Sequence, residues 1–163
     1  MNGQIRKYDY LSYNRHDVLR PNLIFWALAI FLSRHLVLLL FLGVSHGKGG
    51  GGPANPAVAA LIDPLFFISD VPALTLLCAL GGRLPGGGGL ARVLWHNGRV
   101  LLLGSCALYL GLLVWQEGTD PATYHPVTWT MIALTILAGA YISLSRYLKD
   151  MFAQFPEAPD GAG

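Results

Sequence analysis

Residues 33–41 have the sequence SRHLVLLLF, in which Arg34 and His35 interrupt an otherwise apolar stretch. The apolar stretch begins at Asn22 and continues to Val44. That length matches the ~20 residues that a helix needs to cross a bilayer. A rise of ~1.5 Å per residue places Arg34 about 18 Å from the start of such a helix, near the membrane centre. Two ionisable side chains therefore lie where a charge is most costly.

The composition of the whole chain agrees with a membrane location. Of its 163 residues, 53% are hydrophobic and only 12% are charged, and the mean hydropathy is +0.48. A soluble domain of this length could not bury so much apolar surface in one core. Basic residues lie in short flanking segments, so no nucleic-acid partner is indicated. Cys78 and Cys106 lie in apolar segments without metal-ligand spacing, which predicts neither a disulfide nor a zinc site.

Four apolar segments are long enough to span a bilayer, and strong helix breakers separate them. They are Asn22 to Val44, Pro56 to Leu80, Leu90 to Trp115 and Pro126 to Leu148. Backbone groups in lipid need internal partners, and no alternating strand pattern is visible, so each segment is expected to be a helix. The predicted fold is all-α, an integral membrane bundle of four transmembrane helices over residues 22–148. A juxtamembrane segment, 1–21, precedes the bundle, and a tail, 149–163, follows it.

The distribution of basic residues predicts the orientation. Arginine and lysine precede the first helix, surround the second loop and follow the fourth helix, whereas the other two loops contain only Lys48. Positive residues favour the cytoplasmic side of a membrane. Both termini are therefore expected in the cytoplasm.

Six ionisable side chains within the predicted helices are expected to form an intramembrane polar cluster. A guanidinium at the depth of Arg34 cannot face lipid, so it should face the bundle and find a carboxylate. Asp63 and Asp70 lie seven residues apart on one face of the second helix and bracket that depth. We expect Asp70 to be the partner of Arg34, with Asp63 as the alternative. The expected cluster comprises Arg34, His35, Asp63, Asp70, His96 and Arg99.

Two functional interpretations of this cluster stay open. Buried ion pairs can fix the register of the helices, which describes a structural or accessory membrane protein. A polar cavity that binds or passes a proton or a small anion describes a small carrier, with Arg34, Asp70 and Arg99 as its working residues. An enzyme is not expected, because no nucleophile, base and acid occur at a recognisable spacing.

No cofactor or metal is expected. His35 and His96 are the only histidines within the predicted spans, and their depths differ by more than one helical turn. That mismatch disfavours a haem between them, because its two ligands must approach one iron from opposite faces.

Prolines and small residues predict details of the helix packing. Pro64 and Pro72 follow the two aspartates, so the second helix is expected to kink beside its carboxylates. Small residues recur at helical spacing on the third and fourth helices, a pattern that suits close helix contact. They are Gly104, Ala107 and Gly111 on the third helix and Thr135, Gly139 and Ser143 on the fourth.

Residues 8–45, YDYLSYNRHDVLRPNLIFWALAIFLSRHLVLLLFLGVS, resemble the start of the YfeZ-like family of bacterial inner-membrane proteins. The shared features are Tyr8 with Asp9, Leu19 with Pro21 ahead of the first helix, and Arg34 within it. The resemblance implies a compact multi-pass protein of the inner membrane of a Gram-negative bacterium. It implies no activity and no catalytic residue. Expected partners are the lipid bilayer and either a larger envelope complex or further copies of the chain.

Overall fold

The computed structural model describes residues 8–14, 18–46, 64–84, 87–118 and 124–156. Within these ranges the regular structure is helical, apart from one isolated antiparallel bridge between Tyr13 and Leu19. The all-α prediction is therefore confirmed. In chain order the helices are η1 (Tyr10–Ser12), α1 (Leu23–Leu32), α2 (Arg34–His46), η2 (Pro64–Phe66), α4 (Phe67–Gly81), α5 (Gly89–His96), α6 (Gly98–Glu117), α7 (Pro126–Leu144) and α8 (Arg146–Ala153).

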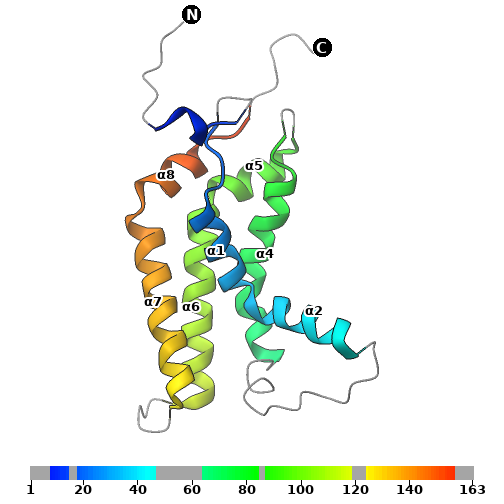
Figure 1. Ribbon diagram of the computed structural model, residues 1–163, viewed down its shortest axis with the longest axis vertical. Helices are drawn as coiled ribbons and strands as arrows, with labels where there is room; N and C mark the ends of the chain where they lie inside the picture. The colour runs from blue at the N-terminus through cyan, green and yellow to red at the C-terminus, as the bar shows by residue number, and fades with distance from the viewer. Residues whose placement is uncertain (1–7, 15–17, 47–63, 85–86, 119–123, 157–163) are drawn as a thin grey trace, which may run out of the picture.

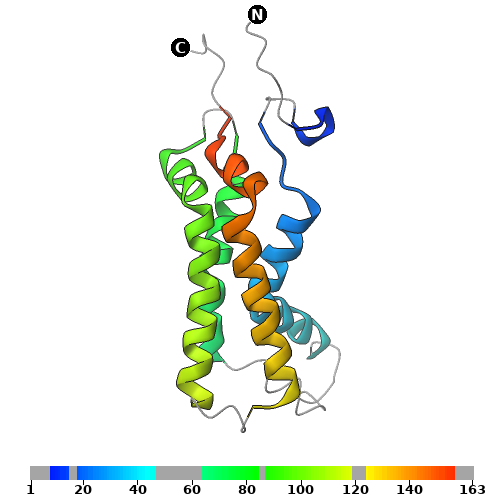
Figure 2. The same ribbon diagram turned by 90° about the vertical axis from the view of Figure 1, so that its left-hand side faces the viewer.

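The long helices run alongside one another as a bundle (Figure 1). α6 lies against both α4 and α7, and α1 packs onto α4 and α6. α2 leaves the bundle sideways, whereas the short helices α5 and α8 lie at the opposite end, near the described N-terminal segment (Figure 1, Figure 2). We call that end, where α5 and α8 lie, the terminal end of the bundle.

Within the described residues, three elements are long and apolar enough to cross a membrane. They are Pro64–Gly81, which joins η2 to α4, and the helices α6 and α7. α1 and α2 together qualify as a fourth span, but this pair is bent by 74°. Three to four apolar helices are compatible with a membrane protein. The segment predicted over Pro56–Leu80 is described from Pro64 onwards, and α4 continues through Pro72.

Three of the helices that were expected to be continuous are interrupted. The breaks fall at Ser33, Asn97 and Ser145, within the predicted segments 22–44, 90–115 and 126–148. At Ser145 the hydroxyl accepts a hydrogen bond from the N–H of Leu148 at 3.3 Å and so begins a new helix. At Asn97 the side-chain amide donates to the carbonyl of Val93 at 2.9 Å. Short polar side chains compete with the helix backbone for hydrogen bonds, and this favours breaks at such residues.

An aromatic core lies at the terminal end. The rings of Phe25, Trp95 and Phe152 contact one another, with centroids 5.0 Å apart for Trp95 and Phe152. The buried indole of Trp95 donates from Nε1 to the carbonyl oxygens of Met151 and Gln154, at 3.1 and 3.0 Å. Its polar atom is thus satisfied, as the burial of a tryptophan requires. These contacts hold α8 against α1 and α5.

A guanidinium joins the two ends of the described chain. Arg83, which follows α4, donates to the carbonyl of Leu19 at 2.9 Å and to that of Gln154 at 3.1 Å. The same guanidinium lies 4.3 Å from the centre of the Trp95 ring. Burial lowers the pKa of Arg83 to about 10. We call Arg83 with Leu19, Trp95 and Gln154 the terminal clasp.

Gly98, the first residue of α6, allows α8 to approach closely. A Cβ atom at this position would overlap the buried ring of Phe152. Gly98→Ala therefore forces a core ring to move, and we expect it to lower the free energy of unfolding by about 1 to 3 kcal/mol. Thermal unfolding in detergent measures the loss. Gly104→Ala is the matched control, because a Cβ there meets nothing within 4 Å. Equal losses for the two variants would contradict the close approach.

Candidate functional site

The helical region over residues 23–46 is interrupted at Ser33, and α2 begins directly after it. The first backbone N–H groups of a helix have no partner within that helix. The hydroxyl of Ser33 is buried and makes no hydrogen bond to the described part of the chain. Instead, Asp70 of α4 accepts a hydrogen bond at Oδ2 from the N–H of Leu36, at 3.0 Å. A carboxylate from a neighbouring helix therefore caps α2.

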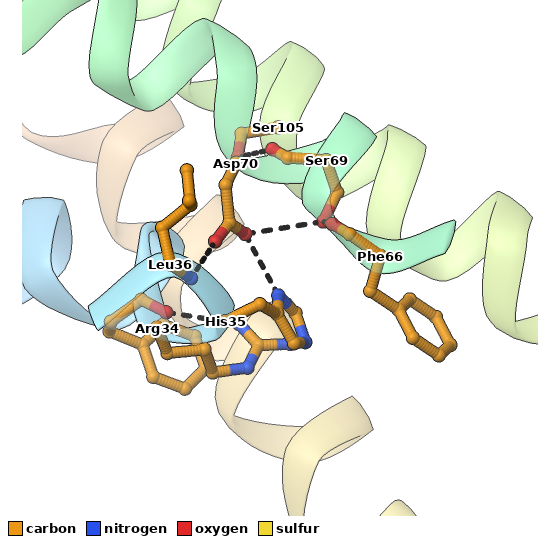
Figure 3. A network of polar contacts seen from close by, with 8 residues as sticks. Arg34, His35, Leu36, Phe66, Ser69, Asp70 and Ser105 are labelled. Carbon is orange, nitrogen blue, oxygen red and sulfur yellow. Dashed lines mark hydrogen bonds and ion pairs between the residues drawn. The ribbon is translucent and has the colours of Figure 1, made fainter. Parts of the chain in front are cut away.

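The other oxygen of Asp70 accepts a hydrogen bond from His35. His35 Nδ1 lies 2.8 Å from Asp70 Oδ1 (Figure 3). Both side chains are buried, with exposed fractions of 2% for His35 and 0% for Asp70. Asp70 also lies in the first turn of α4, where the helix dipole favours a negative charge. The carboxylate is thus stabilised by an imidazole, by a backbone N–H and by its own helix.

The His35 ring contacts two aromatic rings. It stacks on Phe66 of η2, with centroids 5.4 Å apart, and lies tilted against Tyr109 of α6 at 5.8 Å. Phe66 and Tyr109 contact each other at 5.4 Å. Because Nδ1 donates to Asp70, Nε2 is the ring nitrogen that has no hydrogen bond within the described residues. The imidazole is therefore held by η2, α4 and α6 together.

Arg34 does not form the predicted ion pair with Asp70. Its Nη1 donates to the carbonyl of Phe31 at 3.0 Å. The guanidinium carbon lies 4.0 Å from the centre of the Tyr109 ring and 4.6 Å from that of Phe31. Nε and Nη2 are buried and have no hydrogen-bond partner in the ranges that the structure describes. Two aromatic faces thus stabilise the cation where a carboxylate was expected.

The predicted pairing was wrong because it assumed one continuous helix. Neighbouring residues of a helix point about 100° apart, so the direction of a new helix decides which of them faces a given partner. The break at Ser33 starts α2 with His35 facing Asp70 and Arg34 facing the aromatic rings. Asp63, the alternative partner of Arg34, lies outside the described residues, and that alternative stays a prediction.

The other predicted members of the cluster lie away from Asp70. His96, the last residue of α5, is exposed and donates from Nδ1 to the backbone carbonyl four residues earlier, at 2.9 Å. Arg99 donates to the carbonyl oxygens of Ile142 and Ser143, at 3.1 and 2.7 Å, close to the end of α7. The break at Asn97 separates these two residues into different helices. The structure therefore assembles Arg34, His35 and Asp70 into one site and places His96 and Arg99 at the terminal end.

Several residues of the site were missed by the sequence reasoning. Ser105 of α6 donates to the carbonyl of Ser69, and Ser69 donates to the carbonyl of Phe66 at 2.7 Å (Figure 3). Tyr109 follows Ser105 by four residues, so both lie on the face of α6 that packs on α4. This spacing of a polar and an aromatic residue within an apolar helix is the sequence feature from which both site residues could have been predicted.

The small-residue stripes do not mark close helix contacts within this chain. A Cβ added at Gly104, Gly111 or Gly139 would meet nothing within 4 Å. The predicted close packing is therefore wrong for these three glycines. Thr135 is buried, but its hydroxyl donates to the carbonyl of Met131 in its own helix, at 2.7 Å.

The site combines a buried carboxylate, an imidazole and a guanidinium at a bend in an apolar helix. Such a pair can hold two helices together, or it can exchange a proton when one partner becomes accessible to water. The described residues contain no group of three or more His, Cys, Asp and Glu side chains that could hold a metal ion.

No curated protein and no solved structure matches the chain. The model of one family, described as "Protein of unknown function (DUF2919)", matches residues 8–154. This range contains α1 to α8 together with the terminal clasp. The resemblance seen at the N-terminus implied a family without an assigned activity, and that expectation is confirmed, whereas the YfeZ-like name stays a prediction. The match covers far more than half of the sequence, and the chain therefore belongs to the DUF2919 family.

Proposed function

We propose that the protein is a small structural or accessory component of the bacterial inner membrane, that it crosses this membrane four times, and that it is not an enzyme. The observation that carries the proposal is the burial of Asp70 together with its hydrogen bonds. Its two oxygens are occupied by donors of α2, and the residue is fully buried. A carboxylate that bound a substrate would need a free oxygen or contact with water.

The energetics of burial support a role in holding the bundle. A charged group taken out of water costs several kcal/mol unless donors replace its hydration. Asp70 finds such donors in α2, and Arg34 finds aromatic faces in α1 and α6. The polar groups of the site thus connect helices of the same chain. In this proposal the partners of the protein are the lipid bilayer and a larger envelope complex.

The proposal is tested by separating stability from function. The double variant His35→Leu/Asp70→Leu replaces the pair with apolar residues, which can be nearly neutral for folding. A structural component should regain part of the thermal stability that either single variant loses, and it should still complement a deletion strain. Normal folding together with lost complementation would contradict the structural proposal.

A proton-coupled carrier is the second candidate, because a titratable pair lies at a break in an apolar helix. Broken helices form the ion sites of many transporters. Arg99 is remote from this pair, so the working residues of a carrier would be His35, Asp70 and Arg34. Proteoliposomes with an internal pH dye distinguish the candidates. Proton uptake that requires His35 and Asp70 favours the carrier, whereas a flux equal to that of empty vesicles favours the structural role.

The orientation of the chain gives a separate prediction. The N-terminal segment, the connection between α4 and α5, and α8 lie at one end of the bundle, and basic residues concentrate there (Figure 1). With that end in the cytoplasm, reporter fusions after Gly50, Gly87 and Gly118 should report periplasm, cytoplasm and periplasm. Any other pattern would contradict the four-pass topology.

A further inference from the structure

Two short helices at the terminal end share an unusual arrangement. α5 (Gly89–His96) and α8 (Arg146–Ala153) are separated from the long helices α6 and α7 by the breaks at Asn97 and Ser145. α8 does not continue along the axis of α7 but lies across the end of the bundle (Figure 1). Both helices therefore lie where the ends of the predicted membrane spans meet the headgroup layer.

α5 presents three kinds of surface. Trp95 is fully buried in the aromatic core. Leu90 and Val93, three residues apart, point outward with exposed fractions of 74% and 59%. Arg92 and His96, four residues apart, are exposed on the arc between these two faces. A helix with a protein face, an apolar outer face and a basic face fits the boundary between acyl chains and headgroups.

α8 also carries exposed basic side chains, on the side of the helix that faces away from the bundle. Leu148, Met151 and Phe152 are buried against the bundle. Arg146 and Lys149, three residues apart, are exposed on the opposite side of the helix. α5 and α8 contact each other, so their cations belong to one end of the molecule.

These basic side chains have no acidic partner in the described part of the chain. No ion pair involves Arg92, His96, Arg146 or Lys149 among the described residues. Asp150 of α8 accepts a hydrogen bond from the hydroxyl of Tyr8 at 2.7 Å. The Arg92 guanidinium lies 5.4 Å from the centre of the Phe155 ring and stays exposed. Arg92, Arg146 and Lys149 are therefore exposed and form no ion pair within the described residues.

We propose that Arg92, His96, Arg146 and Lys149 form a basic interfacial surface that binds the phosphate groups of anionic phospholipids. Arginine and lysine are the residues that bind phosphate, and a cation near an anionic leaflet strengthens its binding. The exposed Leu90 and Val93 favour a lipid over a soluble anion, because they offer contacts to acyl chains. This inference rests on the proposed membrane location.

The experiment uses the full-length chain in mild detergent, titrated with phosphatidylglycerol or phosphatidylcholine and examined by native mass spectrometry. We expect the wild type to retain phosphatidylglycerol in preference to phosphatidylcholine. Each charge removed in Arg92→Gln/Arg146→Gln/Lys149→Gln should weaken this retention about fivefold. The matched control, Arg92→Lys/Arg146→Lys, keeps the charges and should keep the preference. An unchanged preference in the glutamine variant would overturn the assignment, as would inorganic phosphate that displaces the lipid at equal concentration.

Extraction with alkaline carbonate tests the proposed membrane location separately from the basic interfacial surface. A chain that carbonate releases from membranes is not integral, and this result would overturn the proposed membrane location itself. A chain that stays in the membrane but binds both lipids equally would overturn the basic interfacial surface alone. Retention in the membrane together with the phosphatidylglycerol preference supports both.

Discussion

Asp70→Leu is expected to lower the free energy of unfolding in detergent by about 3 to 5 kcal/mol. The substitution leaves the N–H of Leu36 without its cap and the buried imidazole of His35 without its acceptor. Removing one member of a buried pair is costly because the other member keeps its desolvation penalty. Thermal and denaturant unfolding of the purified chain measure the loss. Asp70→Asn keeps an acceptor oxygen for Leu36 and should cost less.

A double-mutant cycle identifies the partner of Asp70. His35→Leu alone should also destabilise the protein, and adding it to Asp70→Leu should recover part of the loss. The recovery should be incomplete, because the N–H of Leu36 still lacks an acceptor. The cycle of Arg34→Met with Asp70→Leu is the control and should show a smaller coupling energy. A larger coupling for Arg34 than for His35 would contradict the observed pairing.

Arg83→Met is the second substitution with a large expected effect, a loss of about 2 to 4 kcal/mol. Methionine fills much of the same space but cannot donate to the carbonyl oxygens of Leu19 and Gln154. Hydrogen bonds from a charged donor are worth more than neutral ones, and the two acceptors are partly buried. The contact with the Trp95 ring is lost as well.

Arg83→Met should loosen the attachment of α8 in addition to lowering the stability of the whole protein. Without the terminal clasp, α8 is held less firmly, so trypsin should cleave after Lys149 faster than in the wild type. Arg92→Met is the matched control, because the guanidinium of Arg92 is exposed and makes no hydrogen bond within the described residues. A cleavage rate and melting temperature equal to those of the control would show that the clasp contributes nothing.

Much of the fold was predictable because membrane helices are determined by length and hydropathy. The segments beginning at Leu90 and Pro126 match helical regions of the structure within a few residues at each start. The breaks at Ser33, Asn97 and Ser145 were not predicted; only the second of them has a glycine, Gly98, directly beside it. A serine or asparagine breaks a helix only where tertiary contacts stabilise the broken conformation, and these contacts cannot be read from the local sequence.

The candidate site was predictable in part. The burial of Asp70 and its contact with a basic residue of the first helix follow from the cost of a charge in an apolar span. Whether that residue is Arg34 or His35 depends on how α2 is rotated after Ser33, and hydropathy does not determine this rotation. The aromatic faces of Tyr109 and Phe66 could not be foreseen, because hydropathy does not distinguish them from other apolar residues.

The contact between His35 and Asp70 is measured most directly by solid-state NMR of the chain in lipid bilayers, with ¹⁵N-labelled histidine and arginine and ¹³C-labelled aspartate. We predict a through-space signal between His35 Nδ1 and the carboxylate carbon of Asp70, because Nδ1 lies 2.8 Å from Oδ1. The signal should vanish in His35→Gln, which assigns it. A signal between an arginine guanidinium and Asp70, with none from His35, would contradict the pairing.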